Sequence, residues 1–311
     1  MHNELEALKK NNTWTLVPLP KVKGNNSSDI LKVKKYLQEQ FDIKELGTLK
    51  YFLGIKIAHS MKGLFLCQRK YVLDLLKETS KLAAKPVKTP IETTAKLNTE
   101  EGTPLHDISM YQRLVDKLIY LTVTRPGITF EVSNVSQFLH APRTSHLSVV
   151  YRILHYLKAA LGVGIWMKRN NCIDIIGYTD AYWACNFDRK STTDFCTFVG
   201  GNLVMWRSKK QKTVSRSNVK AEYRVMAATN GELIWIKYIL TNLGVELKTI
   251  KMYCNNNAAR YIASNLVFHE RTKQIELKLI VTLFVRRFNL VRLKPPLYLA
   301  KINLLIFSRR L

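Results

Sequence analysis

The chain has 311 residues, enough for two domains of ordinary size, and a hydrophobic content of 47% that is typical of a globular protein. Lysine and arginine together number 49 against 23 aspartate and glutamate, so the formal net charge is +26. Such an excess favours a polyanionic partner, above all nucleic acid, although a coding sequence that drifted basic without selection would look the same. No apolar run approaches the ~20 residues that cross a bilayer, so we expect no membrane segment.

The cysteines and the N-terminal residues indicate in which cellular compartment the protein is expected. The five cysteines include no C-x-x-C pair, so we expect neither a zinc site nor a disulfide framework. The N-terminal residues form no apolar signal region. We therefore expect an intracellular protein, of the cytoplasm or the nucleus.

The N-terminal third predicts short elements joined by turns. A helix is expected at residues 31–41, a hairpin at 51–67 with its turn near Lys62-Gly63, and an amphipathic helix at 71–79. Residues 85–108 are rich in threonine, proline and charge, which predicts the best linker in the chain.

Helical periodicity dominates the next segment. Apolar residues at helical spacing predict helices at 111–124, 130–140 and 146–161. Pro126 and Pro142 fall outside these ranges, because proline interrupts the hydrogen bonds of a helix interior.

The following segment alternates strand and helix patterns. Gly201-Asn202 predicts a tight hairpin turn. A mixed sheet with a helix packed across it, an α/β domain, is the architecture that this order favours. Strands are expected at 173–180, 195–199, 203–206 and 250–254, and a long helix at 217–243.

Glu222 is a candidate ligand within that long helix. It shares an apolar stripe with Met226 and Leu233, so it would be buried toward the sheet. A buried carboxylate is costly unless it binds a cation or a hydrogen-bond donor. The pattern therefore favours a site between Glu222 and the end of the first strand, at Asp180.

Four motifs, in this order, resemble those of Copia-type retrotransposon Pol polyproteins. Residues 4–20 (Glu-Leu-Glu-Ala-Leu-Lys-Lys-Asn-Asn-Thr-Trp-Thr-Leu-Val-Pro-Leu-Pro) resemble the opening of the reverse transcriptase. Three later stretches resemble the ribonuclease H domain: residues 177–184 (Gly-Tyr-Thr-Asp-Ala-Tyr-Trp-Ala), 253–256 (Tyr-Cys-Asn-Asn) and 264–273 (Ser-Asn-Leu-Val-Phe-His-Glu-Arg-Thr-Lys).

The resemblance implies an internally deleted reverse transcriptase. The family places its fingers and palm, with a Tyr-Val-Asp-Asp turn, between segments that here meet across residues 20–27. Phosphoryl transfer by two metals needs paired carboxylates on a rigid support, and no Asp-Asp pair occurs in the sequence. We therefore expect no polymerase activity.

The resemblance also implies the domain order. We expect a truncated reverse transcriptase remnant, then a helical thumb and connection region, then a ribonuclease H-like α/β domain with a mixed sheet, and a tail that matches nothing. The corresponding residues are 1–105, 106–170, 171–303 and 304–311.

In this family, four carboxylates hold two Mg²⁺ ions. The resemblance places two of them at Asp180 and Glu222, while Asn255 takes the third place and Lys301 the fourth. The alternative for Asp180 is a residue that only caps a strand. Independently, Glu276 is an alternative for the fourth ligand.

The substituted positions argue against metal binding. An amide oxygen is neutral, whereas Mg²⁺ favours anionic oxygen ligands. Two charges about 4 Å apart interact by about 4 kcal/mol at an effective dielectric near 20, so a cation at Lys301 would repel the metals. The family also has aspartate where Tyr182 stands. We expect no productively bound Mg²⁺.

A basic stretch precedes the long helix. In the family it lies near the RNA/DNA hybrid, and the alternative is a solvated loop. The cations are Arg207, Lys209, Lys210 and Lys212.

Together these observations predict a degenerate Pol fragment, a pseudoenzyme without catalytic activity. Two alternatives remain: a nucleic-acid-binding module that retains affinity for the RNA/DNA hybrid, and a weak Mg²⁺-dependent hybrid ribonuclease. We expect nucleic acid as the partner class, and neither a membrane nor a small-molecule substrate.

Overall fold

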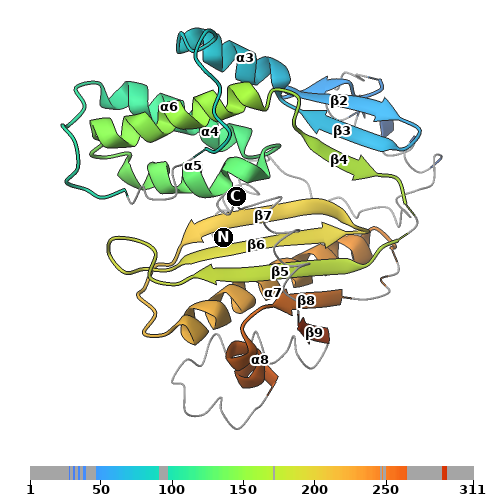
Figure 1. The fold of residues 1–311 in the computed structure, drawn as a ribbon. Coiled ribbons are helices and arrows are strands. Elements are labelled where there is room, and N and C mark those ends of the chain that lie inside the picture. Colours follow the sequence, from blue (N-terminus) through green and yellow to red (C-terminus); the bar gives the residue numbers. More distant parts are fainter. Residues whose placement is uncertain are drawn as a thin grey trace, which may run out of the picture. The chain divides into compact units, whose positions relative to one another are not determined.

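The computed structural model describes residues 28, 31, 34, 35, 38, 39, 47–90, 97–170, 172–245, 247, 250–264 and 289–292. The chain divides into two units, one formed by Met1–Gly47 with Ile239–Val245 and the other by the rest. In the first unit, the described residues between 28 and 39 are helical, in agreement with the helix predicted at 31–41. The second unit contains two sheets (Figure 1).

The first sheet has four antiparallel strands in the order β1-β2-β3-β4. β2 and β3 form the predicted hairpin, in which Ser60 pairs with Gly63 around Met61 and Lys62. β4 joins from far along the chain, with Ile165 opposite Leu66. The strand bounds are β1 Tyr51–Phe52, β2 Ile55–Ser60, β3 Gly63–Cys67 and β4 Ile165–Lys168.

A group of helices shares one hydrophobic core beside this sheet. Val72 of α3, Leu118 of α4 and Ile153 of α6 are fully buried in it. Elements from both sides of residue 105 therefore contribute to the same core. The helical elements are α3 Arg69–Glu78, α4 Ile108–Leu121, η1 Pro126–Ile128, α5 Thr129–Val135, η2 Ser136–Phe138 and α6 Thr144–Ala159.

Local hydrogen bonds explain where these helices begin and how they are joined. α4 begins earlier than predicted because the Asp107 side chain accepts a hydrogen bond from Met110 N over 2.8 Å. The hydroxyl of buried Tyr111 donates to Val135 O over 2.8 Å and so ties α4 to the end of α5. The helix predicted at 130–140 is split, since α5 continues only as the 3₁₀ turn η2.

The described part of the predicted linker is held against α6. Thr103 N donates to Thr144 Oγ1 over 3.1 Å, and Leu97 and Leu105 pack against the helical core. Residues 97–105 are therefore part of the helical region rather than a free connection.

The second sheet contains five strands in the order β7-β6-β5-β8-β9. β7, β6 and β5 are antiparallel neighbours, whereas β8 and β9 run parallel to β5. This mixed sheet confirms the predicted α/β class. The bounds are β5 Ile175–Tyr182, β6 Thr192–Val199, β7 Asn202–Lys210, β8 Ile250–Cys254 and β9 Asn289–Arg292.

Two local predictions in this sheet were wrong. The β6–β7 turn consists of Gly200 and Gly201, both with positive φ (56° and 75°), and Asn202 already pairs with Val199. β7 also extends to Lys210, so three of the four cations of the basic stretch lie on a strand, and only Lys212 lies beyond it.

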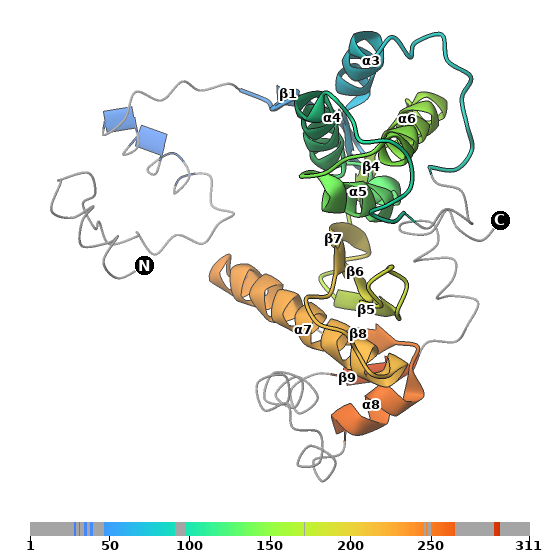
Figure 2. The same ribbon diagram turned by 90° about the vertical axis from the view of Figure 1, so that its left-hand side faces the viewer.

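The two faces of this sheet are covered differently. α7 (Asn218–Asn242) runs along one face, where Ala221 and Val225 pack on Phe195 (Figure 2). On the other face, Tyr178 stacks on Tyr253, and Trp206 Nε1 donates to Thr122 O over 3.1 Å. α8 (Asn257–Ser264) follows β8. Over the described residues, none of the helices is both long and apolar enough to cross a membrane.

His146 is fully buried near the start of α6 and is held in one tautomer. Its Nδ1 accepts from Arg143 N over 3.0 Å, and its Nε2 lies 2.8 Å from Asn98 O, so Nε2 carries the proton. Burial lowers the pKa of His146, the Asn98 carbonyl opposes this shift, and the Arg143 charge adds to it. Protonation at Nδ1 would break the bond to Arg143.

Acid should therefore destabilise this region through His146. Its pKa is lower in the folded chain than the usual value of 6.5, so the contribution of His146 to stability is complete above pH 6.5 and falls as the pH drops below it. The slope is at most about 1.4 kcal/mol per pH unit. We expect His146→Gln to lower the free energy of unfolding at neutral pH and to lose this slope. Urea titrations on either side of the unfolded pKa measure both effects, and parallel curves for the two proteins would contradict the expectation.

Candidate active site

Two of the predicted site residues meet at one end of the second sheet. Asp180 lies near the end of β5, and the parallel pairing of Thr179 with Cys254 places Asn255 just beyond β8 at the same end. The side-chain Nδ2 of Asn255 donates to Asp180 Oδ1 over 3.4 Å, which is long for a hydrogen bond.

Glu222 reaches the same place from the first turns of α7. Its side chain is only 2% exposed. Its carboxyl accepts a hydrogen bond from the Ala181 backbone N–H and feels the charge of Asp180. Among the described residues, Glu222 Oε2 has no hydrogen-bond partner. The helix thus turns this carboxylate toward the end of β5 rather than toward solvent.

The environment of Glu222 disfavours its charged form. Burial raises its pKa to about 9, and Asp180 and Asp194 add to the shift, while the Ala181 N–H opposes it. Glu222 is therefore protonated at neutral pH. Cys254, buried beside it, remains a thiol, because burial and the nearby Glu222 raise its pKa to about 12.

Asp194 is a third carboxylate that sequence analysis missed. It lies on β6 directly opposite Asp180 in the strand register and is 1% exposed. Its negative charge helps to raise the pKa of Glu222 and of Cys196. Only the register of β5 against β6 reveals this position, because the flanking sequence is an ordinary apolar strand.

The donor set does not fit a pair of Mg²⁺ ions. Mg²⁺ requires several oxygen ligands in octahedral geometry, mostly anionic or water. Here Asn255 presents an N–H, rather than an anionic oxygen, to Asp180. Within the described ranges, no three His, Cys, Asp or Glu side chains converge in a way that could hold a metal. Lys301, the fourth predicted position, lies outside the described residues, as does Glu276.

The four predicted nucleic-acid-binding cations do not form one row. Side chains alternate between the faces of a strand, so Arg207 and Lys209 lie on one face of β7 and Lys210 on the other. Arg207 Nη1 lies 4.0 Å from Glu232 Oε1 on α7. Lys209 and Lys212 are exposed.

Lys210 is engaged within the protein. Its Nζ lies 3.0 Å from Asp188 Oδ2 and donates to Gln137 Oε1 over 2.9 Å. Lys190 also pairs with Asp188, over 3.1 Å. Hydrogen bonds from Lys210 and Lys190 hold the pKa of Asp188 below its usual value, although burial opposes the shift. Lys210 therefore joins the sheet to the α5–η2 region.

Glu222 should give the domain a stability that falls as pH rises. The unfolded side chain ionises near 4.5 and the folded one near 9, so folding takes up a proton between these values. The free energy of unfolding then falls by about 1.4 kcal/mol per pH unit across this window. We expect Glu222→Gln, which cannot ionise, to lack that slope in urea titrations with EDTA.

The same titrations with Mg²⁺ in place of EDTA form the control. A bound metal would favour ionised Glu222 and would stabilise the chain at the alkaline end. Because the donor set does not fit, we expect identical curves with and without Mg²⁺. If Mg²⁺ stabilises the parent but not Glu222→Gln, this expectation is wrong.

Comparisons with known proteins relate most of the chain to one family. Residues 21–93 match the family model described as reverse transcriptase (RNA-dependent DNA polymerase). The chain is 41% identical over 258 residues to the Retrovirus-related Pol polyprotein from transposon RE2 of Arabidopsis thaliana, which covers 82% of this chain and 18% of that protein. It is 40% identical over 201 residues to the uncharacterized mitochondrial protein AtMg00810 of Arabidopsis thaliana, covering 64% of this chain and 83% of that protein.

A solved structure also aligns with part of the chain. RNase H1 from the halophilic archaeon Halobacterium salinarum covers 44% of this chain and 96% of its own, at 10% identity and a TM-score of 0.31. The chain spans only 18% of the length of the RE2 polyprotein.

Proposed function

Since the chain belongs to the family of Copia-type retrotransposon Pol polyproteins, we propose that its ribonuclease H-like domain is a disarmed nuclease that cleaves no nucleic acid. One observation carries the proposal. At the strand ends where a metal would need anionic oxygens, Asn255 directs an N–H toward Asp180. A hydrogen-bond donor satisfies that carboxylate in the place of a cation.

The protonation of Glu222 supports the same conclusion. A metal would have to displace a proton from a carboxyl whose pKa is about 9, and it would gain only one charged ligand by doing so. Asp180, the buried Asp194 opposite it and the neutral amide of Asn255 remain. The proposed reverse transcriptase remnant lacks the paired aspartates of a polymerase, so we expect no primer extension either.

A second candidate function is nucleic-acid binding without cleavage. The net charge of +26 and the exposed Lys209 and Lys212 favour it. Contacts between such side chains and phosphates need no metal, and they weaken as salt increases. The partner would be an RNA/DNA hybrid or one of its strands.

A repair experiment tests whether ligand loss disarmed the site. Asn255→Asp restores one anionic ligand, and Lys301→Asp restores the other that the family resemblance implies. Neither change alone should have a large effect, because residues that act as one unit are strongly non-additive. We expect only the double variant to cleave an RNA/DNA hybrid with Mg²⁺ above the background of the parent.

Binding of the hybrid provides the control for this experiment. All four proteins should bind it with similar affinity and with similar dependence on salt. Cleavage by the unmodified chain that Asp180→Asn abolishes would overturn the proposal and establish the weak ribonuclease instead. If the double variant binds the hybrid but does not cleave it, the loss of nuclease activity has causes beyond the two substituted ligands.

A further inference from the structure

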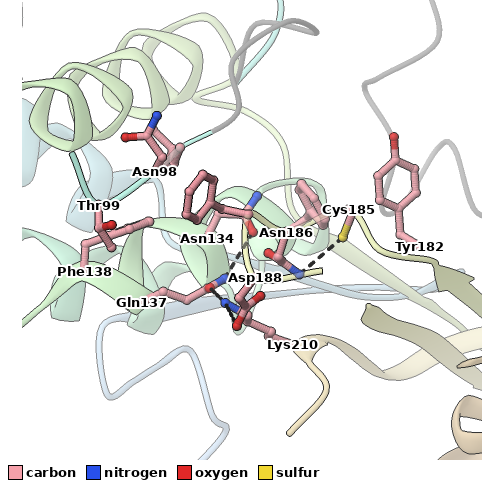
Figure 3. A pocket seen from close by; sticks show the side chains of 13 residues that line it. Asn98, Thr99, Asn134, Gln137, Phe138, Tyr182, Cys185, Asn186, Asp188 and Lys210 are labelled. Carbon is pink, nitrogen blue, oxygen red and sulfur yellow. Dashed lines mark hydrogen bonds and ion pairs between the residues drawn. The ribbon is translucent and has the colours of Figure 1, made fainter. Parts of the chain in front are cut away.

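A pocket with a volume of about 250 Å³ lies between residues 97–99, the α5–η2 region and the loop after β5. Figure 3 shows Asn98 and Thr99 on one side of it and Tyr182 on the other. Phe130 and Phe138 line its helical wall. The pocket lies outside the carboxylate site, although Tyr182 is only two residues from Asp180 on the same strand.

The interior of this pocket suits a neutral ligand. Its two charged side chains, Asp188 and Lys210, are paired with each other over 3.0 Å. A charged group that entered would therefore find no uncompensated partner inside. Ligand pockets for drug-sized molecules span about 300–1,000 Å³, so this one fits a smaller group.

Amide nitrogens in the wall can donate to such a ligand. Asn98 Oδ1 accepts from the backbone N–H groups of Glu100 (2.9 Å) and Glu101 (2.8 Å), which directs Nδ2 away from them. Asn134 Oδ1 accepts from Gln137 Nε2 over 3.5 Å. The hydrogen bonds described for Asn98 and Asn134 engage their oxygens, so the Nδ2 groups are the donors that these amides can offer a ligand.

Aromatic side chains at the mouth provide flat apolar surfaces. Tyr182 is 42% exposed and Phe187 is 73% exposed. Both line the pocket. Exposed Arg189 follows Asp188 on the same loop and lines a neighbouring hollow with Trp183, while Lys190 pairs with Asp188 over 3.1 Å.

We infer that this pocket binds one unpaired nucleobase of a single-stranded nucleic acid. Tyr182 and Phe187 stack on the base, and the amides of Asn98 and Asn134 donate to its carbonyl or ring-nitrogen acceptors. Exposed Arg189, on the loop that follows, neutralises an adjacent phosphate. This inference rests on the proposed nucleic-acid binding and specifies its preferred strand form. A base held in a duplex cannot enter, because its edge is paired and both its faces are stacked.

Binding of a fluorescein-labelled twelve-nucleotide dT strand to the full chain tests the inference by anisotropy. Stacking on one aromatic side chain is worth about 1–3 kcal/mol, so Tyr182→Ala should weaken binding about 5- to 150-fold. Tyr182→Phe keeps the ring and should bind like the parent. Trp235→Ala is the matched control, since Trp235 is 54% exposed on α7 and lines no part of the pocket.

A second variant and a second probe guard against indirect effects. Asn134→Asp keeps the side-chain shape but replaces the donor by a carboxylate, and it should also weaken binding of the strand. Fluorescence of 2-aminopurine within the strand should be quenched by the parent and recover with Tyr182→Ala. Binding of a fully paired RNA/DNA hybrid should not change in either variant.

The outcomes separate the inference from the proposed function. If the parent binds the strand and the hybrid, and Tyr182→Ala binds both equally well, the pocket inference is wrong while nucleic-acid binding stands. If the parent binds neither, both are wrong. Selective loss of the single strand in Tyr182→Ala and Asn134→Asp, with Tyr182→Phe and Trp235→Ala unchanged, supports the pocket.

Discussion

The close approach of α7 to β5 determines the geometry of the C-terminal domain. A Cβ atom at Gly177 would lie 3.0 Å from Leu233 Cδ1 and 3.1 Å from Thr229 Cγ2, so only glycine lets the helix lie this near the strand without displacing its side chains. The same contact sets the distance between α7 and the sheet. Glu222, three turns earlier, is consequently buried beside the end of β5, where it meets the charge of Asp180.

Periodicity and strand order were sufficient to predict much of this arrangement. Parallel strands end at the same edge of a sheet, so Asp180 and Asn255 could be placed together, and the apolar stripe of the helix predicted the burial of Glu222. Asp194 could not be found in this way, because its position depends on the register between two strands. The pairing of Lys210 with Asp188 depends in turn on how far β7 extends, which tertiary contacts decide.

Two kinds of site on this domain respond differently to a change of residue. At the carboxylates, metal binding needs several anions acting together, so under the proposed function the single amide at Asn255 is enough to weaken it. Contacts with nucleic acid contribute to affinity roughly independently of one another and tolerate different sequences. Replacing one of them therefore leaves most of the affinity in place. A Pol-derived chain under weak constraint would therefore lose cleavage well before it loses affinity.

The first sheet has a consequence for synthesis on the ribosome. β3 and β4 pair from Gly63 to Leu66 against Lys168 to Ile165, so the sheet stays one strand short until the chain has been made past Lys168. The loop that must close is long, which delays the pairing. A premature stop codon between these strands would leave β3 as an open edge with unpaired backbone groups, and such edges pair with other chains. Shortened translation products of this gene would thus be prone to aggregate rather than to fold as smaller domains.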